Sequence, residues 1–265
     1  MTAIIAIPIT IYLIGFSPRW VFYLFLFLFS VAGLNEYYRI VLPETPVYLK
    51  AVNMLLALAL FLTLYTGKVL LMPGVITLTV IIPMLFFLFT DPLGGGKYLT
   101  ETGRMAAGFM YICVPLAMLV QIDRLYLLNH SVRGIWIFFL LVVTAANDTG
   151  AFYSGKLFGR YKLYERVSPQ KTWEGAIGGV IFGLIAATLF LKIFRIHPVD
   201  PAVILLIIVL SAAGQAGDLA ESMLKRNFNI KDSGGLFPGH GGILDRVDSL
   251  LFAAPVLYIF LMVII

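Results

Sequence analysis

The stretch from Asp218 to Asp248 reads DLAESMLKRNFNIKDSGGLFPGHGGILDRVD and is a polar island in an otherwise apolar chain. It concentrates acids, bases, a histidine and five glycines between two apolar segments, residues 201–220 and 247–265. Each of these segments is about long enough to cross a bilayer, which takes roughly 20 apolar residues. The sequence therefore predicts a hydrophobic frame that carries a polar site where two membrane-spanning helices end.

The composition points to the same fold class. The chain has 265 residues, of which 60% are hydrophobic and 12% charged, whereas soluble domains carry about 25% charged residues. We therefore expect an all-α, polytopic integral membrane protein. The net charge of +5 is explained by basic loops that face anionic lipid headgroups, so we expect no nucleic-acid partner. The one cysteine, Cys113, excludes an intrachain disulfide.

Hydropathy predicts about nine transmembrane helices. The first is short, and it is expected either to span the bilayer or to re-enter it. Met1–Gly15 has no basic region before its apolar run and no cleavage pattern after it, so we expect it to be retained. The nine segments are residues 3–16, 20–36, 48–66, 69–90, 104–121, 134–153, 173–194, 201–220 and 247–265.

The basic residues predict the orientation. Loops at residues 37–47, 91–103, 154–172 and 221–246 fall on one side of the membrane and, with their flanks, hold 13 of the 19 Lys and Arg residues. The positive-inside rule places that side in the cytoplasm. We expect residues 1–133 to form a transmembrane scaffold. Residues 134–265 are expected to form the catalytic half, with cytoplasmic loops 154–172 and 221–246.

One glycine run elsewhere is not assigned a function. The run from Asp91 to Lys97, DPLGGGK, resembles a phosphate-binding loop at first sight. It lacks the spacing of a P-loop and no strand precedes it. We interpret it as a connecting loop.

Polar groups return at the end of the sixth segment with Asn147 and Asp148, and five basic residues follow between Lys156 and Lys171. Asp148 is expected either at the membrane interface or facing a polar cavity. Ser168 or Thr172 is a candidate N-cap for the next helix. Basic side chains beside a helix N-terminus suit a phosphate-rich ligand.

Three glycines in the seventh segment, Gly175, Gly179 and Gly183, recur every four residues. Small residues at this period allow helix backbones to approach closely in lipid. The partner helix predicted for them is the eighth segment, which has its own Gly214 and Gly217.

Within the polar island, acidic residues gather at two helix ends. Asp218, Glu221, Ser222 and Lys225 share one face of a helix at spacings of three and four. Asp245 and Asp248 repeat the spacing of three where the last segment begins. Carboxylates from two helix ends favour Mg²⁺ over zinc. Together with basic side chains and a glycine loop, they indicate phosphoryl-type transfer.

The order of residues in the island resembles a family signature. Ser-x-x-Lys-Arg begins at Ser222, and Lys-Asp-Ser-Gly-Gly begins at Lys231. Phe-Pro-Gly-His-Gly-Gly begins at Phe237 and ends just before Ile-Leu-Asp-Arg-x-Asp. With blocks 147–151 and 168–175, this pattern closely resembles the phosphatidate cytidylyltransferases, also called CDP-diacylglycerol synthases. Gln170 stands where that family is expected to have lysine. Residues before 130 match only as hydrophobic spans.

The resemblance implies that CTP and phosphatidic acid react to give CDP-diacylglycerol and pyrophosphate, with Mg²⁺, at the cytoplasmic side of the inner membrane. The sequence leaves a second cation and a homodimer open. The expected metal ligands are Asp218, Asp245 and Asp248, with Glu221 near them. The expected catalytic residues are Lys171, Lys225, Arg226, Lys231, His240 and Arg246. The expected substrate-binding residues are Asp148, Ser168, Thr172, Ser222, Gly241 and Gly242.

Three alternatives differ in substrate or class. A related enzyme would use CTP on another lipid phosphate or on a polyprenol. A transporter would also place acids and glycines in broken helices. A CDP-alcohol phosphotransferase would need the run DxxDGxxAR, which this sequence lacks.

Overall fold

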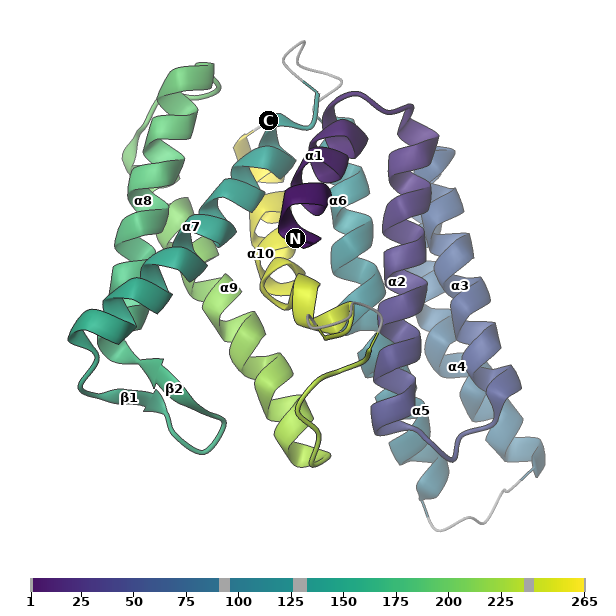
Figure 1. The fold of residues 1–265 in the computed structure, drawn as a ribbon. Coiled ribbons are helices and arrows are strands. Elements are labelled where there is room, and N and C mark those ends of the chain that lie inside the picture. Colours follow the sequence, from purple (N-terminus) through teal and green to yellow (C-terminus); the bar gives the residue numbers. More distant parts are fainter. Residues whose placement is uncertain (1, 91–95, 126–132, 236–240, 265) are drawn as a thin grey trace. The chain divides into compact units, whose positions relative to one another are not determined.

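The computed structural model describes residues 2–90, 96–125, 133–235 and 241–264 (Figure 1). Almost all regular structure in these ranges is helical, and the one sheet in them is a two-stranded hairpin. The predicted all-α membrane fold is confirmed. The chain packs into two compact units. The first comprises residues 1–16, 121–231 and 245–265, and the second comprises residues 17–120 and 232–244.

Among the described residues, eight helices are long and apolar enough to cross a membrane, whereas the sequence predicts about nine. The difference is α1 (Thr2–Gly15), whose 14 residues reach only about 21 Å against about 30 Å of hydrocarbon. This changes only the side on which the N-terminus falls, because the later loops keep their predicted grouping. The eight spanning helices are α2 (Arg19–Val41), α3 (Val47–Tyr65), η1 (Val69–Leu71) with α4 (Met72–Thr90), α5 (Lys97–Gly108) with η2 (Phe109–Cys113) and α6 (Val114–Leu125), α7 (Ile135–Phe158), α8 (Trp173–Phe194), α9 (Pro201–Asn227) and α10 (Leu244–Ile264).

Several helices run past the predicted ends of their apolar segments. α7 continues to Phe158, so Asn147 and Asp148 lie inside the helix and not at its end, where the sequence predicted them. α9 likewise continues to Asn227 and keeps Lys225 helical. Hydropathy marks where side chains turn polar, but backbone hydrogen bonding continues until the helix is capped or broken. A helix can therefore carry polar residues beyond the apolar core of its span.

In the second unit, α2 packs beside α3, α5 and η2 (Figure 1). The hydroxyl of Tyr37 donates to the carbonyl of Arg104 at 3.1 Å. A Cβ at Gly108 would lie 2.5 Å from the Tyr37 ring, so this glycine allows the two helices to approach. η2 is a π-helix, and such single turns shift the helix register locally. Leu34, Leu60 and other fully buried side chains fill the space between these helices.

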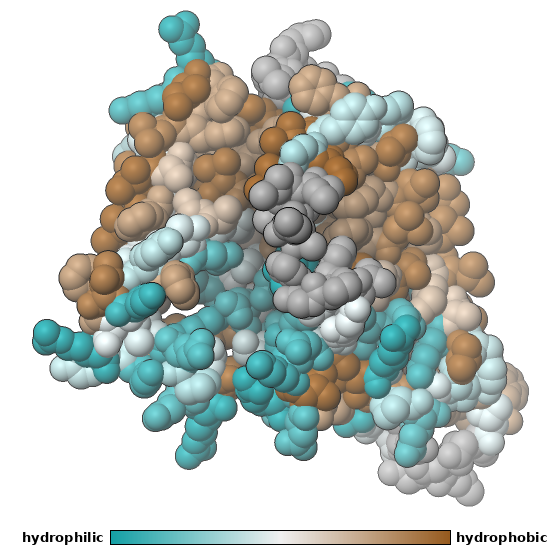
Figure 2. Space-filling model, viewed as in Figure 1, coloured by the Kyte–Doolittle hydropathy of each residue, from teal (hydrophilic) through white to brown (hydrophobic). Residues whose placement is uncertain are grey.

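In the first unit, α8 lies along α7 and connects to it through the hairpin (Figure 1). The opposite face of α8 carries exposed apolar side chains every four residues. Figure 2 shows apolar colour over α8 and hydrophilic colour gathered over the hairpin. The stripe suits contact with lipid chains, because apolar side chains there need no protein partner. It consists of Ile177, Ile181, Ile185, Leu189 and Ile193.

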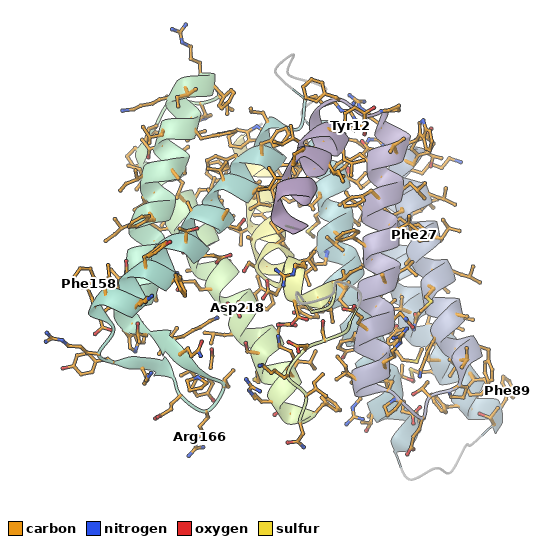
Figure 3. The ribbon with its side chains drawn as sticks, viewed as in Figure 1. Tyr12, Phe27, Phe89, Phe158, Arg166 and Asp218 are labelled. Atoms are coloured by element: carbon orange, nitrogen blue, oxygen red, sulfur yellow. The ribbon has the colours of Figure 1, made fainter. Side chains whose placement is uncertain are left out.

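The hairpin consists of β1 (Lys162–Tyr164) and β2 (Ser168–Thr172), which pair antiparallel. The sequence indicated only a basic loop in this segment. Figure 3 shows Arg166 at its turn, pointing away from the helices. Thr172 ends β2 and caps α8, since its hydroxyl accepts a hydrogen bond from the amide of Gly175 at 3.1 Å. The predicted N-cap is thus Thr172, and it fixes the end of the hairpin to the start of α8.

The glycines of α8 permit close packing against the predicted partner α9 and, in addition, against α7. A Cβ at Gly175 would lie 2.8 Å from the carbonyl of Ala151 in α7. Gly179 faces Asn147 of α7 and Gln215 of α9, and Gly183 faces Ser211 of α9. On α9, Gly217 instead faces the backbone of Asp248 in α10. The glycines of α8 and α9 therefore contact other side chains and backbones rather than one another.

We expect Gly179→Ala to destabilise the protein by about 1–3 kcal/mol, the usual cost of overpacking. Its new methyl group would lie 2.7 Å from Oδ1 of Asn147 and 2.8 Å from the carbonyl of the same residue. Thermal unfolding in detergent measures the change. Gly74→Ala in α4 is the matched control, because nothing lies within 4 Å of its Cβ position. An equal, small effect of both substitutions would contradict tight packing at Gly179.

Candidate active site

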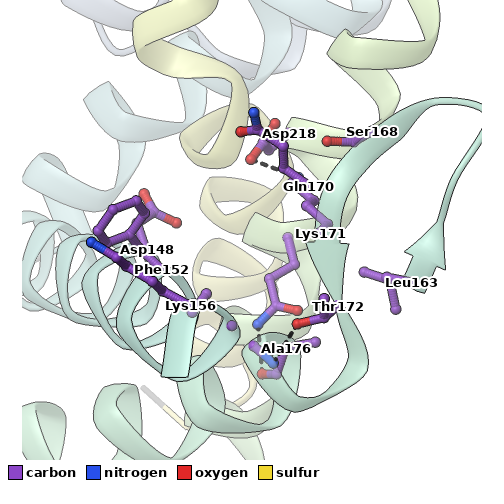
Figure 4. Close-up of a pocket in the computed structure, with 14 residues that line it drawn as sticks. Asp148, Phe152, Lys156, Leu163, Ser168, Gln170, Lys171, Thr172, Ala176 and Asp218 are labelled. Atoms are coloured by element: carbon purple, nitrogen blue, oxygen red, sulfur yellow. Dashed lines mark hydrogen bonds and ion pairs between the residues drawn. The ribbon is translucent and has the colours of Figure 1, made fainter. Parts of the chain in front are cut away.

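A pocket of about 480 Å³ opens between α7, the hairpin, α8 and α9 of the first unit (Figure 4). Nearly all of its lining comes from one continuous part of the chain, residues 148–176, and only two lining residues come from α9. Acidic, basic and amide side chains share the wall with glycine and alanine. The lining residues are Asp148, Ala151, Phe152, Gly155, Lys156, Leu163, Ser168, Gln170, Lys171, Thr172, Gly175, Ala176, Gln215 and Asp218.

An ion pair joins the hairpin to α9 at this pocket. Nζ of Lys171 lies 2.6 Å from Oδ2 of Asp218 (Figure 4). Lys171 sits in β2 directly before the Thr172 cap, so the start of α8 holds its backbone in place. Asp218 also accepts a longer hydrogen bond of 3.4 Å from the hydroxyl of Ser222, one helical turn on. The side chains of Lys171 and Asp218 are 25% and 38% exposed, but Nζ of Lys171 is itself buried.

Three carboxylates act on one another electrostatically in this region. Asp218 of α9 acts on both Asp148 of α7 and Asp248 of α10, and Asp148 and Asp248 also act on each other. Lys171 is an opposite charge for all three. Three acids around one ammonium leave an excess of negative charge. Such an arrangement favours a further cation over a further anion.

Two amides link the three helices at the pocket: Asn147, which is buried, and Gln215, which is half-buried and lines the pocket. Nε2 of Gln215 donates to Oδ1 of Asn147 at 2.8 Å and to the carbonyl of Ala176 at 3.0 Å. Asn147 is buried, and its own Nδ2 lies 3.4 Å from Oδ1 of Asp148. Two of these hydrogen bonds join α9 to α7 and α8, and the third leads to the carboxylate of Asp148. The series of hydrogen bonds therefore fixes Asp148 relative to α8 and α9.

A second charged group lies farther along α9. Nζ of Lys225 is 2.6 Å from Oε2 of Glu221 and 2.6 Å from Oδ1 of Asp245 on α10. Glu221 is only 1% exposed. The contacts between Glu221 and Lys225 and between Asp218 and Ser222 confirm that these four residues share one helix face. Lys225 thus bridges two helices, whereas its predicted contact with substrate phosphate stays a prediction.

The remaining predicted residues fall in different places. Ser168 and Thr172 line the pocket, but Ser222 does not. Arg226, Lys231 and Arg246 are exposed. Nε of Arg226 lies 3.5 Å from the carbonyl of Val167 in the hairpin turn. Gly241 and Gly242 belong to the second unit, where Gly241 has a positive φ of 76°. His240 lies outside the described residues.

Two residues that the structure makes prominent were not predicted from the sequence. Gln215 was not singled out, although an amide in the apolar run SAAGQAG signals a partner at membrane depth. Glu36 was assigned to the scaffold, yet it is a buried acid at 6% exposure. Its signal was similar, namely a polar side chain within a span, and in Glu36 this side chain is also ionisable.

The oxygen donors at the pocket suit a hard cation. In the ranges that the structure describes, no three His, Cys, Asp or Glu side chains are arranged to hold a metal by themselves. Mg²⁺ usually takes only one or two carboxylates and completes its shell with water and substrate phosphates. Asp148 and Asp218 line the pocket, and Asp248 interacts electrostatically with both, so the three acids offer hard oxygen atoms and excess negative charge. In its chemistry the site therefore fits Mg²⁺ that arrives with a phosphate ligand.

Relatives of the chain include named enzymes. The phosphatidate cytidylyltransferase of Bacillus subtilis (strain 168) is 41% identical over 162 residues, which is 61% of this chain and 58% of that protein. The enzyme of the same name from Brucella suis biovar 1 (strain 1330) is 48% identical over 128 residues, 47% of this chain and 46% of that protein. The matches thus span about half the length of these relatives.

Two further comparisons extend over the chain. The uncharacterised protein YnbB of Escherichia coli (strain K12) is 32% identical over 262 residues, which is 92% of this chain and 80% of that protein. The model that describes the cytidylyltransferase family matches residues 1–264. The match therefore includes the N-terminal helices as well as the pocket, and the chain belongs to the cytidylyltransferase family.

Proposed function

We propose that the protein is a phosphatidate cytidylyltransferase, which makes CDP-diacylglycerol and pyrophosphate from CTP and phosphatidic acid. Family membership and the names of the relatives support this class of reaction. The observation that carries the proposal is the Lys171–Asp218 ion pair at a pocket with further acids around it. Such a pocket offers one group for anionic phosphate oxygens and others for the cation that accompanies a nucleotide.

In the proposed reaction an oxygen of the phosphatidate phosphate attacks the α-phosphorus of CTP. A new bond forms between that oxygen and the α-phosphorus. The bond from the α-phosphorus to the oxygen that bridges to the β-phosphorus breaks, and its electron pair leaves with pyrophosphate. The phosphate monoester has a second pKa of about 6, so it is already ionised near neutral pH and needs no general base. Positioning and charge neutralisation then supply most of the catalysis.

The chain's own residues divide this work. Asp218, Asp245 and Asp248 are proposed to hold Mg²⁺, with Asp148 and Glu221 near them. The bound cation supplies neutralisation of developing phosphate charge. Lys171 is proposed to bind phosphate oxygens by exchanging part of its interaction with Asp218 for the substrate. The other cationic residues proposed for this role are Lys225, Arg226, Lys231 and Arg246, and His240 is proposed to position phosphate with Gly241 and Gly242.

The membrane location follows from the substrates. Acyl chains of phosphatidic acid stay in hydrocarbon, while CTP is water-soluble, so the reaction needs a polar site at the membrane boundary. We propose that this boundary is the cytoplasmic face of the inner membrane, because the loops on that side hold most of the basic residues. A homodimer is proposed only from the resemblance to the phosphatidate cytidylyltransferases.

Pyrophosphate release by the purified protein in detergent tests the function. We expect release that requires CTP, phosphatidic acid and Mg²⁺ together, with CDP-diacylglycerol formed in equal amount. A panel of other lipid phosphates and polyprenols distinguishes related enzymes, since one of them would replace phosphatidic acid as the best substrate. Flux across vesicles without consumption of CTP would identify a transporter and overturn the proposal.

A further inference from the structure

Glu36 of α2 is a buried acid that binds a distant part of the chain. Its Oε1 accepts a hydrogen bond from the amide of Ile243 at 3.0 Å. Its Oε2 accepts one from the amide of Leu244 at 3.0 Å and one from the hydroxyl of Ser233 at 3.1 Å. All four residues belong to the second unit. One carboxylate from the first quarter of the chain therefore binds both Ser233 and the start of α10.

Two glycines of the signature make room for this carboxylate. A Cβ at Gly234 would lie 2.5 Å from Oε1 of Glu36. A Cβ at Gly242 would clash with Oε2 of Glu36 and with the hydroxyl of Ser233. Any side chain at either position would push the carboxylate away. These glycines are thus required by the approach of Glu36, in addition to any approach of a phosphate.

The hydrogen bonds also fix the start of α10. Leu244 is the first residue of that helix, and the first amides of a helix have no partner within it. A side chain close in sequence usually caps them, but here the carboxylate comes from another helix. A negative charge at this position also interacts favourably with the helix dipole. Asp245 and Asp248 follow directly in the first turns of the same helix.

Placing an acidic side chain in a membrane span costs free energy, so such a residue usually has a partner that offsets this cost. For Glu36 the compensating partners are two backbone amides and a hydroxyl, all from the segment Ser233–Leu244. Its carboxylate therefore fixes the backbone at the start of α10. Since Asp245 and Asp248 continue the helix that begins at Leu244, the direction of their side chains depends on how that helix end is held.

We propose that Glu36 is a positioning residue for catalysis. Its carboxylate accepts hydrogen bonds from Ser233, Ile243 and Leu244 and so orients the first turn of α10, which carries Asp245 and Asp248, the proposed ligands of metal and substrate phosphates. The inference rests on the proposed function and extends it to a helix that the sequence assigned to the scaffold.

Glu36→Gln tests the role with a side chain of nearly equal size. The amide keeps one acceptor oxygen and replaces the other with a donor, so it cannot satisfy both Ile243 and Leu244. We expect kcat to fall about 10- to 100-fold and the Mg²⁺ concentration for half-maximal activity to rise, as usual when an outer partner of a metal ligand is lost. Ser233→Ala removes one of the three hydrogen bonds and should cause a smaller loss.

Hydrogen exchange supplies a readout that needs neither CTP nor metal. Amides of residues 241–248 should exchange faster in Glu36→Gln than in the unaltered protein. Glu101→Gln is the matched control, because Glu101 is another buried acid of the second unit, accepting a hydrogen bond from Thr45 at 3.0 Å. It should leave exchange at 241–248, specific activity and Mg²⁺ dependence unchanged.

The outcomes separate the two proposals. If the unaltered protein releases no pyrophosphate from CTP and phosphatidic acid, the proposed function fails. If it does, and Glu36→Gln keeps kcat and Mg²⁺ dependence per folded molecule, Glu36 has only a structural role and the inference is overturned. A lower Tm without a change in either parameter would overturn it as well. If the Glu36→Gln protein does not fold, Ser233→Ala is the variant that tests the proposal. An unchanged Mg²⁺ dependence of Ser233→Ala would then contradict the positioning role.

Discussion

Asp218→Asn is expected to lower the rate of CDP-diacylglycerol formation by about 100-fold or more, a loss typical of removing one key electrostatic group. The substitution removes one of the acids near the pocket and leaves the Lys171 ammonium without its 2.6 Å partner. Stability should fall by about 1–3 kcal/mol, because the substitution leaves the buried Lys171 ammonium without its partner. Pyrophosphate release per folded molecule, measured beside thermal unfolding in detergent, checks both expectations.

Glu165→Gln is the control for this substitution. Glu165 is an exposed acid in the turn of the same hairpin and does not line the pocket. Removing its charge should leave the rate unchanged, which shows that the effect of Asp218→Asn is local. Near-normal turnover by Asp218→Asn would exclude a metal or phosphate role for Asp218.

Lys225→Met is expected to destabilise the protein by about 3–5 kcal/mol, the usual cost of breaking one side of a buried ion pair. Its ammonium lies 2.6 Å from both Glu221 and Asp245, and Glu221 is 1% exposed. Without Lys225, two carboxylates face each other with little water to screen them. Denaturant or thermal unfolding in detergent measures the loss.

The double variant Glu221→Gln with Lys225→Met should recover at least half of that stability. It removes the more deeply buried of the two acids, and replacing both members of a buried pair is often nearly neutral. The recovered protein should stay inactive if Lys225 also contacts substrate phosphate. If the double variant is as unstable as Lys225→Met alone, the Glu221 contact is not the source of the instability.

Local patterns could be predicted from the sequence. Helical spacing correctly placed Ser222 over Asp218 and Lys225 over Glu221, because such contacts depend only on residues one turn apart. The N-cap Thr172 could be recognised for the same reason. Hydropathy likewise identified eight of the spans, since the bilayer imposes their length.

Contacts between distant helices could not be predicted in this way. The basic segment forms a hairpin in which Lys162 pairs with Thr172. No local pattern in the sequence indicates this pairing. Gln215 and Glu36 look like isolated polar residues until packing brings Asn147 or the start of α10 to them. Their partners are set by tertiary structure, so the sequence could signal that a partner exists but not which one.

The order of the pocket residues along the chain also bears on how the protein is made. Lys171 and the other basic residues of segment 156–171 leave the ribosome before Asp218, since α8 and most of α9 lie between them. While α7 and α8 enter the membrane, these positive charges have no acid from α9 beside them. We therefore expect them to act first as a topogenic signal that retains the hairpin on its side of the bilayer. Lys171 would then serve biogenesis before it serves the finished site.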